Sequence, residues 1–151
     1  MPTDGQAMQL ALAEARAAAA RGEVPVGAVL LAPDRRVLAR AGNRTEQDHD
    51  AAAHAEMLVM REAARALGSP RLPGCTLVVT LEPCAMCAAA AGLFRVARVL
   101  FGAYDPKAGG IVHGARIYDS PAAQHRPEII GGLREREAAA LLRDFFQGLR
   151  G

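Results

Sequence analysis

The feature that most constrains this chain is the segment Thr80–Cys87, in which Pro83 stands directly before the two cysteines of a Cys-x-x-Cys pair. An apolar run over 75–79 leads into it and an alanine-rich run follows, so the pattern predicts a strand that turns into a helix. Pro83 favours a helix start because its fixed φ suits the first helical position. The spacing puts both sulfurs on one helix face, near the positive end of the helix dipole. We therefore expect Cys84 and Cys87 to be thiolate ligands forming half of a metal site.

The other half of the predicted site is His54-Ala55-Glu56, at the start of a second predicted helix. One imidazole and two thiolates give zinc three protein ligands and leave a fourth position for water, which is typical of a catalytic zinc. Glu56 lies two positions from His54, close enough to move the proton of that water without binding the metal. His-x-Glu followed by Pro-Cys-x-x-Cys is recognised as the signature of zinc-dependent nucleobase deaminases.

Simpler interpretations of these residues stay open. A Cys-x-x-Cys pair after a strand can be a redox motif, although a proline before the first cysteine counts mildly against it. A closed structural zinc site, as in a non-catalytic binding module, needs a fourth ligand and leaves Glu56 without a role. The candidates for that ligand are Cys75, His49, His113 and His125. We predict that Cys75 is instead a buried apolar side chain and that His49 lies in a solvated loop.

Length and composition indicate the class of protein. A chain of 151 residues predicts one domain over 1–151, and 51% hydrophobic with 23% charged residues is within the globular range. Three cysteines, two of them in one Cys-x-x-Cys, indicate metal or redox use in a reducing compartment. We expect a cytoplasmic protein with no membrane segment, because no apolar run is long enough to span a bilayer and no secretion signal is present. The net charge of +2 permits a nucleic-acid partner without arguing for one.

Hydrophobic periodicity predicts alternating helices and strands. Helices are expected over 4–20, 51–67, about 84–94 and 134–147, and strands over 24–31, 37–41, 75–79, 98–102 and 127–132. The segment 103–124 is long for a structureless loop, so we expect it to be functional or to contain a short helix. A hairpin followed by strand–helix alternation predicts a mixed sheet with helices on both faces. Crevices at the strand ends of such sheets bind ligands.

Nearly the whole chain, from Met8 to Arg150, resembles the bacterial tRNA adenosine deaminases within the cytidine deaminase-like superfamily. The zinc motifs alone indicate only the superfamily. The tRNA enzymes are indicated by further matching stretches, at 23–29 (EVPVGAV), 42–44 (GNR), 101–103 (FGA), 105–107 (DPK) and 144–146 (DFF). The resemblance implies an α/β protein with the three-layer α-β-α cytidine deaminase-like fold and a central mixed five-stranded sheet.

The resemblance also implies a zinc-dependent hydrolase that converts adenosine to inosine at the wobble position of a tRNA anticodon by means of a zinc-activated water. His54, Cys84 and Cys87 would hold one Zn²⁺ per subunit, and Glu56 would be the catalytic residue. The partner would be a tRNA anticodon stem-loop, whose loop bases can be splayed out for recognition. Members of this family work as homodimers that hold the loop across both subunits, so we expect a homodimer.

Contacts with the substrate are also assigned by resemblance, to Val26, Asn43, Ala85, Asp105, Lys107, Phe145 and Phe146. Asn43 would hydrogen-bond the flipped base beside Val26, and the backbone at Ala85 would donate to the attacking oxygen. Asp105 would contact the sugar of the target nucleotide or its neighbour, Lys107 a phosphate, and the two phenylalanines the pocket rim. Simpler roles stay open, because Asn favours turns, an isolated Lys is ordinarily on the surface, and Phe on an amphipathic helix is ordinarily core.

The chain departs from the family pattern before His54 and after Cys87, among other places. Ala51–Ala53 stands where the family usually has Pro-Thr-Ala, and Phe94, at the end of the run 88–94, stands where a small residue is usual. These departures leave the zinc chemistry unchanged but affect residues expected to bind RNA or to form the subunit interface, and therefore affect the choice of substrate. The main alternative is therefore a free nucleobase or nucleoside deaminase, acting on guanine or cytosine with the same zinc site. Asn43, Asp105 and Lys107 favour the RNA enzyme, since small-base enzymes need them less.

Overall fold

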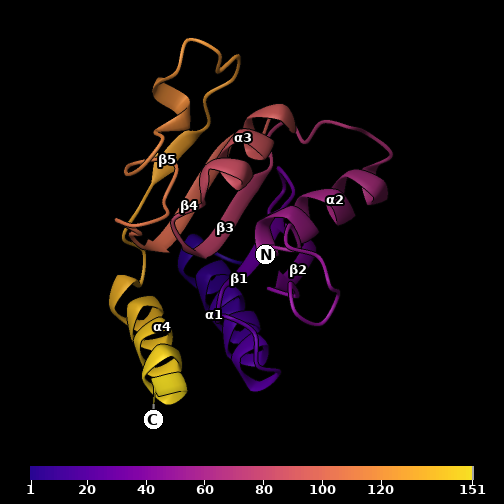
Figure 1. Ribbon diagram of the computed structural model, residues 1–151. Coiled ribbons are helices and arrows are strands. Elements are labelled where there is room, and N and C mark those ends of the chain that lie inside the picture. The colour runs from indigo at the N-terminus through magenta and orange to yellow at the C-terminus, as the bar shows by residue number, and fades with distance from the viewer. Residues whose placement is uncertain (151) are drawn as a thin grey trace.

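A computed structural model of the chain describes residues 1–150 (Figure 1). Gly151, the last residue of the predicted domain, lies outside the described residues. The elements in chain order are α1 (Asp4–Ala20), β1 (Gly27–Leu31), β2 (Val37–Gly42), α2 (Ala55–Leu67), β3 (Thr76–Leu81), α3 (Ala85–Leu93), β4 (Arg98–Ala103), the 3-10 helix η1 (Ile117–Asp119), β5 (Glu128–Ile130) and α4 (Glu135–Arg150). Every predicted helix and strand is present, and η1 is the short helix expected after β4. None of the helices within 1–150 combines the length and apolarity needed to cross a bilayer.

The five strands form one mixed sheet in the order β2-β1-β3-β4-β5. Strand β1 is antiparallel to both β2 and β3, whereas β3, β4 and β5 run parallel. Leu81 at the end of β3 pairs with Ala103 at the end of β4. The segments that follow these two strands therefore begin side by side at the carboxyl ends of the strands, which is where parallel sheets bind ligands.

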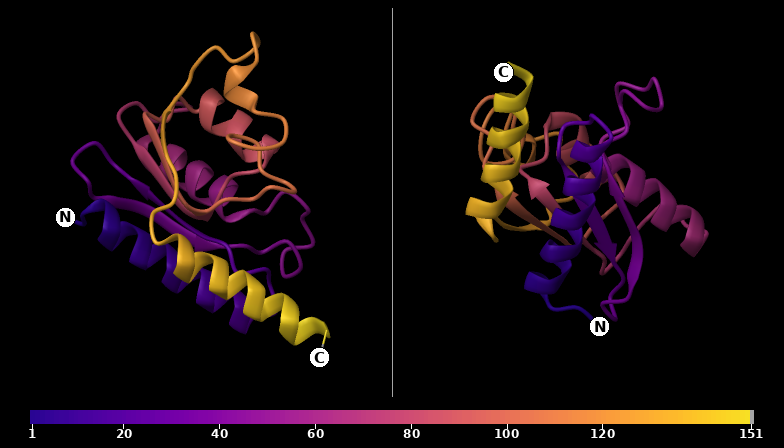
Figure 2. Two further views of the ribbon diagram at one scale, coloured as in Figure 1. Left: turned by 90° about the vertical axis from the view of Figure 1, so that its left-hand side faces the viewer. Right: turned by 90° about the horizontal axis from the view of Figure 1, so that it is seen from below.

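Side chains of the central strands alternate between two apolar cores, one on each face of the sheet. Val29, Val78 and Leu100 pack in one core with residues of α1 and α4. Leu77 and Val79 pack in the other with residues of α2 and α3. Figure 2 shows α1 and α4 side by side on one face, away from α2 and α3. The predicted three-layer α-β-α architecture is confirmed, and burial of both faces explains why these strands are apolar at nearly every position.

Helix α1 starts as predicted and packs very closely on the sheet. Thr3 is the N-cap and forms a capping box with Gln6. A Cβ on Gly27 would overlap the carbonyl oxygen of Ala11. Glycine at the start of β1 therefore permits the close approach of helix and strand.

Two predicted helix starts are wrong. Helix α2 begins at Ala55 and not at residue 51, because the preceding alanines form hydrogen bonds outside the helix. The carboxylate of Asp50 accepts from the N–H of Ala52 at 2.9 Å, and the carbonyl of Ala53 accepts from Arg44 N–H at 3.0 Å. Helix α3 begins at Ala85, so Pro83 precedes the N-cap and is not the first helical residue.

Candidate metal centre

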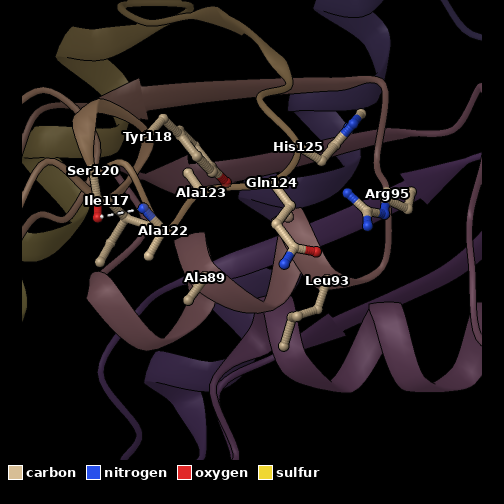
Figure 3. Close-up of a pocket in the computed structure, with 11 residues that line it drawn as sticks. Ala89, Leu93, Arg95, Ile117, Tyr118, Ser120, Ala122, Ala123, Gln124 and His125 are labelled. Carbon is tan, nitrogen blue, oxygen red and sulfur yellow. Dashed lines mark hydrogen bonds between the residues drawn. The ribbon is translucent and has the colours of Figure 1, made fainter.

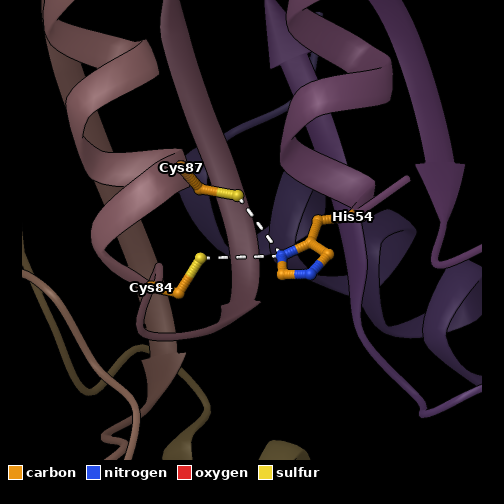
Figure 4. A group of neighbouring side chains, drawn as sticks. All are labelled: His54, Cys84 and Cys87. Atoms are coloured by element: carbon orange, nitrogen blue, oxygen red, sulfur yellow. Dashed lines mark hydrogen bonds between the residues drawn. The ribbon is translucent and has the colours of Figure 1, made fainter. Parts of the chain in front are cut away.

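The two predicted halves of the metal site meet between the first turns of α2 and α3 (Figure 4). His54 is the N-cap of α2, Cys84 is the N-cap of α3, and Cys87 lies on the first turn of α3. The His54 Nδ1 atom is 3.6 Å from Cys84 Sγ and 3.5 Å from Cys87 Sγ. Within the described part of the chain, these three residues are the one group of possible metal ligands whose donor atoms lie together.

The spacing of the donor atoms fits tetrahedral zinc. Bonds of about 2.1 Å to nitrogen and about 2.3 Å to sulfur, at the tetrahedral angle, put the nitrogen and sulfur about 3.6 Å apart. The observed distances from His54 Nδ1 to the two sulfurs are 3.6 and 3.5 Å. One imidazole and two thiolates are also a donor set used by catalytic zinc. The residues present therefore fit the metal.

The two sulfurs differ in their protonation. The hydrogen bond from Cys87 is the main influence on Cys84 and lowers the pKa of its thiol to about 4, with burial opposing it and His54 assisting. The same hydrogen bond, followed by burial, raises the pKa of Cys87. A cation that binds both sulfurs therefore has to displace the proton of the hydrogen bond between them.

Glu56 lies on the first turn of α2 and is only 4% exposed. Its carboxyl group interacts with the Cys87 side chain but does not belong to the ligand group. Burial raises the pKa of Glu56 to about 6. Glu56 therefore places a buried carboxyl group beside the metal ligands.

The residues proposed as a fourth ligand for a closed structural site lie elsewhere. His113 Nδ1 is 2.8 Å from Glu82 Oε1, and His125 Nε2 is 2.7 Å from the carbonyl oxygen of Val96. Cys75 is buried in the core and His49 is exposed, both as predicted. None of the four joins the ligand group formed within residues 1–150. The site thus offers three protein ligands, as a catalytic zinc requires, and a redox pair would leave His54 without a role.

Two of the residues assigned to the substrate, Asn43 and Ala85, lie at the starts of the helices that carry the candidate ligands. The side-chain oxygen of Asn43 accepts from the N–H of Ala55 at 2.8 Å, so it joins the end of β2 to the start of α2. Ala85 is the first residue of α3, and Val26 is buried just before β1. Asn43 therefore has the capping role that its residue type allows, and its side-chain N–H2 group is left as a donor.

The other residues assigned to the substrate are divided between two regions. Asp105 and Lys107 follow β4, beside the carboxyl end of β3, and Lys107 is exposed. Phe145 and Phe146 lie on α4, on the opposite face of the sheet from α2 and α3. Their rings stack edge to face at 5.4 Å, and Phe146 is 43% exposed. The structure thus brings the ligands and Glu56 together but keeps the two phenylalanines in a different layer.

Comparison with known proteins identifies the family. The model of the family "Cytidine and deoxycytidylate deaminase zinc-binding region" matches residues 1–103. A tRNA-specific adenosine deaminase of Agrobacterium fabrum is 52% identical over 143 residues, which cover 95% of this chain and 93% of that relative. The chain belongs to the tRNA-specific adenosine deaminase family. The three candidate zinc ligands of this deaminase, like Glu56, all lie within the matched residues 1–103.

Solved structures resemble the deaminase over almost its full length. One, from work on A-to-I editing by tRNA:A34 deaminases at the wobble position of transfer RNA, matches with a TM-score of 0.88 and 52% identity. The match covers 90% of this deaminase and 98% of that chain. A guanine deaminase from Nitrosomonas europaea matches with a TM-score of 0.81 but only 25% identity, over 96% of this deaminase and 85% of that chain. The free-base enzyme therefore shares the fold at a much lower identity.

The sequence alone did not reveal two buried carboxylates that hold loops next to the site. Glu23 is 1% exposed and accepts from the backbone N–H groups of Glu46 at 3.2 Å and Gln47 at 2.8 Å. Glu82 is 2% exposed and accepts from four backbone N–H groups in the segment after β4. Burial alone would raise the pKa of each carboxyl, but these hydrogen bonds, with the contact of the His113 side chain to Glu82, outweigh it and hold both pKa values below the ordinary 4.5. The apolar residues next to Glu23 and Glu82 in the sequence could have indicated that both carboxylates are buried. A buried charge needs hydrogen-bond partners, so each would then be expected to hold other parts of the chain.

A separate cavity of about 340 Å³ lies between α3 and the segment that contains η1 (Figure 3). Ala89, Leu93 and Tyr118 contribute to its apolar lining, and none of the metal ligands borders it. The Tyr118 hydroxyl donates to the carbonyl oxygen of Ala88 at 2.6 Å. This hydrogen bond ties η1 to α3, the helix that carries both cysteines.

Proposed function

We propose that this deaminase hydrolyses the wobble adenosine of a tRNA anticodon to inosine and releases ammonia. The observation that carries the proposal is the fit of His54, Cys84 and Cys87 to tetrahedral zinc, with a buried carboxyl group beside them. The choice of adenosine in tRNA is supported by the 52% identity to a tRNA-specific adenosine deaminase. It is also supported by the TM-score of 0.88 with the tRNA:A34 deaminase structure.

The zinc ligands and the helix ends prepare the reacting water. Zinc held by His54, Cys84 and Cys87 would supply a water of lowered pKa, which is a hydroxide-like nucleophile near neutral pH. Both helices present their N-terminal ends to this point, so their dipoles favour the thiolates and the developing negative charge. The backbone N–H of Ala85, at the start of α3, is the donor that we assign to the attacking oxygen.

Glu56 is the residue that we assign to proton transfer. Its carboxylate takes a proton from the water as the oxygen adds to C6 of adenine, and passes that proton to ring N1. It then moves the second proton of the water from the oxygen on C6 to the C6 amino group, which leaves as ammonia as the C6=O double bond of inosine forms. Water and adenosine are the only reactants, and inosine and ammonia are the only products. Near-complete burial supports this role, because it limits exchange of the proton with bulk solvent.

Binding of the RNA is assigned to residues around the metal centre. Asn43 is held by its hydrogen bond to Ala55 N–H and donates from its side-chain N–H2 group to the flipped base, with Val26 packed beside that base. Asp105 contacts the sugar and Lys107 a phosphate, and an exposed lysine is suited to a point charge on the backbone.

Phe145 and Phe146 remain assigned to the rim of the substrate pocket. The exposed ring of Phe146 supports a contact with RNA, because aromatic side chains stack on unpaired bases. Both phenylalanines lie on α4, on the other face of the sheet from α2 and α3. Such a contact therefore requires the RNA to extend from the metal centre around the sheet to α4.

The proposed assembly is a homodimer in the cytoplasm. Helix α3 exposes Leu93, which is 79% exposed, together with Met86, and exposed apolar side chains support packing against a second subunit. Of the four alanines from 88 to 91, Ala89 is exposed on this face, and the other three are buried in the core of the subunit itself. The three cysteines are unpaired, which suits the reducing conditions of the cytoplasm.

Ammonia release from a panel of substrates tests the proposal. The zinc-loaded protein is assayed on an anticodon stem-loop with a wobble adenosine, on free guanine and cytosine, and on adenosine, with Glu56→Ala as the blank. We expect release from the stem-loop alone. Turnover of guanine or cytosine with none of the stem-loop would replace the proposal by a free-base deaminase, which the fold shared with the Nitrosomonas europaea guanine deaminase favours as the second candidate.

A further inference from the structure

The side chain of Glu82 accepts hydrogen bonds from several backbone N–H groups of the segment after β4. It lies between the end of β3 and Cys84, and its own N–H donates to the carbonyl oxygen of Ala103 at 2.8 Å. Its Oε2 accepts from three consecutive N–H groups, those of residues 111–113, at 2.9 to 3.2 Å. Its Oε1 accepts from Asp105 N–H at 3.1 Å and lies 2.8 Å from His113 Nδ1. One buried carboxylate thus holds both ends of the segment 105–113.

The segment 105–113 rests directly on Glu82 and on the start of α3. A Cβ on Gly109 would lie 2.5 Å from Glu82 Oε2, and a Cβ on Gly110 would lie 2.5 Å from the backbone nitrogen of Ala85. The N–H of Gly110 donates to the carbonyl oxygen of Pro83 at 2.8 Å. Two glycines therefore allow the segment to be seated against the helix start that carries the cysteines.

A short series of hydrogen bonds leads from Glu82 to Lys107. Glu82 accepts from the N–H of Asp105, and the Asp105 carboxylate accepts from the N–H groups of Lys107 at 3.2 Å and Ala108 at 3.0 Å. Release of the first hydrogen bond would free the turn that carries the lysine. The side chain of Lys107 is exposed, so the position of its ammonium group depends on that turn.

We propose that Glu82 is a positioning residue that holds the segment 105–113 in place and thereby determines how tightly Lys107 binds a phosphate of the RNA. This rests on the proposed function, because it takes an RNA as the ligand of Lys107. Glu82 does not contact the reacting atoms, and its expected effect is on substrate affinity and not on the chemical step.

Glu82→Gln is the variant that isolates this role. Glutamine keeps the shape of the side chain and one acceptor oxygen, but its N–H2 group cannot accept a hydrogen bond. The remaining oxygen is best used by the three N–H groups of residues 111–113, so Asp105 N–H loses its acceptor. Loss of this charge-assisted bond predicts a dissociation constant for the stem-loop raised about tenfold. Zinc content and kcat are expected to stay unchanged.

A double-mutant cycle tests the coupling between Glu82 and Lys107. The dissociation constant of an anticodon stem-loop is measured by fluorescence anisotropy for the wild type, Glu82→Gln, Lys107→Ala and the double variant, beside KM, kcat and zinc content. We expect each single variant to weaken binding and the double variant to be little weaker than either one. Val99→Ala, in the buried core at the start of β4, controls for lost stability and should bind RNA like the wild type.

Each result of the cycle supports or overturns the role of Glu82. Multiplying effects in the double variant, or a fall in kcat or zinc content with unchanged binding, would overturn it. If the wild type binds the stem-loop without deaminating it, the proposed function fails while the cycle in binding still tests Glu82. If the wild type binds no RNA, both fail. If Glu82→Gln does not fold, Gly109→Ala displaces the same segment from the other side and must weaken binding in the same way.

Discussion

Glu23→Ala is expected to destabilise the deaminase strongly, although Glu23 is far in sequence from the metal ligands. The side chain is 1% exposed and accepts from the N–H groups of Glu46 and Gln47 and from the Thr45 hydroxyl. Alanine removes two backbone hydrogen bonds to a charged acceptor, at about 1.5–3 kcal/mol each, so the loss of stability is taken as about 3 kcal/mol. For a domain of this length, the melting temperature should fall by roughly 6–12 °C.

Thermal unfolding followed by circular dichroism at pH 7 and at pH 3 measures this effect. The hydrogen bonds hold the pKa of Glu23 below its ordinary 4.5 despite burial, so the carboxylate stabilises the fold above that pH. This stabilisation is lost as the pH falls through the folded-state pKa. The difference between wild type and Glu23→Ala should therefore shrink at pH 3. Glu46→Gln, which neutralises an exposed carboxylate nearby, should melt within about 1 °C of the wild type. An equal difference at both pH values would refute the reasoning.

Three further substitutions test the site and its support. Glu56→Gln should keep its zinc and lower kcat by about 10²- to 10⁴-fold, because it removes the proton-transfer group; metal analysis beside steady-state kinetics checks this, and normal turnover contradicts it. Cys87→Ser should lose most of its zinc and its activity, since one of three ligands is gone; full zinc content by atomic absorption would show that Cys87 is not a ligand. Tyr118→Phe removes the 2.6 Å hydrogen bond to Ala88 and should lower the stability by about 1 kcal/mol; an unchanged denaturant midpoint would count against that bond.

The sequence was sufficient to predict the parts of the site that local patterns specify. Cys84 and Cys87 share a helix turn, and His54 stands at another helix start, so each half of the metal site was visible in a few residues. The mixed sheet followed from the alternation of apolar strands and amphipathic helices. The number of ligands that zinc needs and the His-x-Glu and Pro-Cys-x-x-Cys signature then joined the two halves, and the distances around His54 Nδ1 agree with zinc.

Errors and omissions arose where distant residues decide the structure. The helix predicted over 51–67 started too early, because the hydrogen bond from Arg44 N–H to the Ala53 carbonyl holds residues 51–53 outside α2. Glu82 and Glu23 were not assigned because their partners lie more than twenty positions away along the chain. Neither contact leaves a local signal beyond an acidic residue in apolar surroundings.

The position of the inosine formed in an anticodon stem-loop tests the central claim most directly. A stem-loop with adenosine at the wobble position and at other loop positions is incubated with the zinc-loaded deaminase, and inosine is located by reverse transcription, which reads it as guanosine. The account predicts conversion of the wobble adenosine alone, and none with Glu56→Gln. An RNA that stays unmodified while free guanine or cytosine is deaminated by the same preparation would contradict the account.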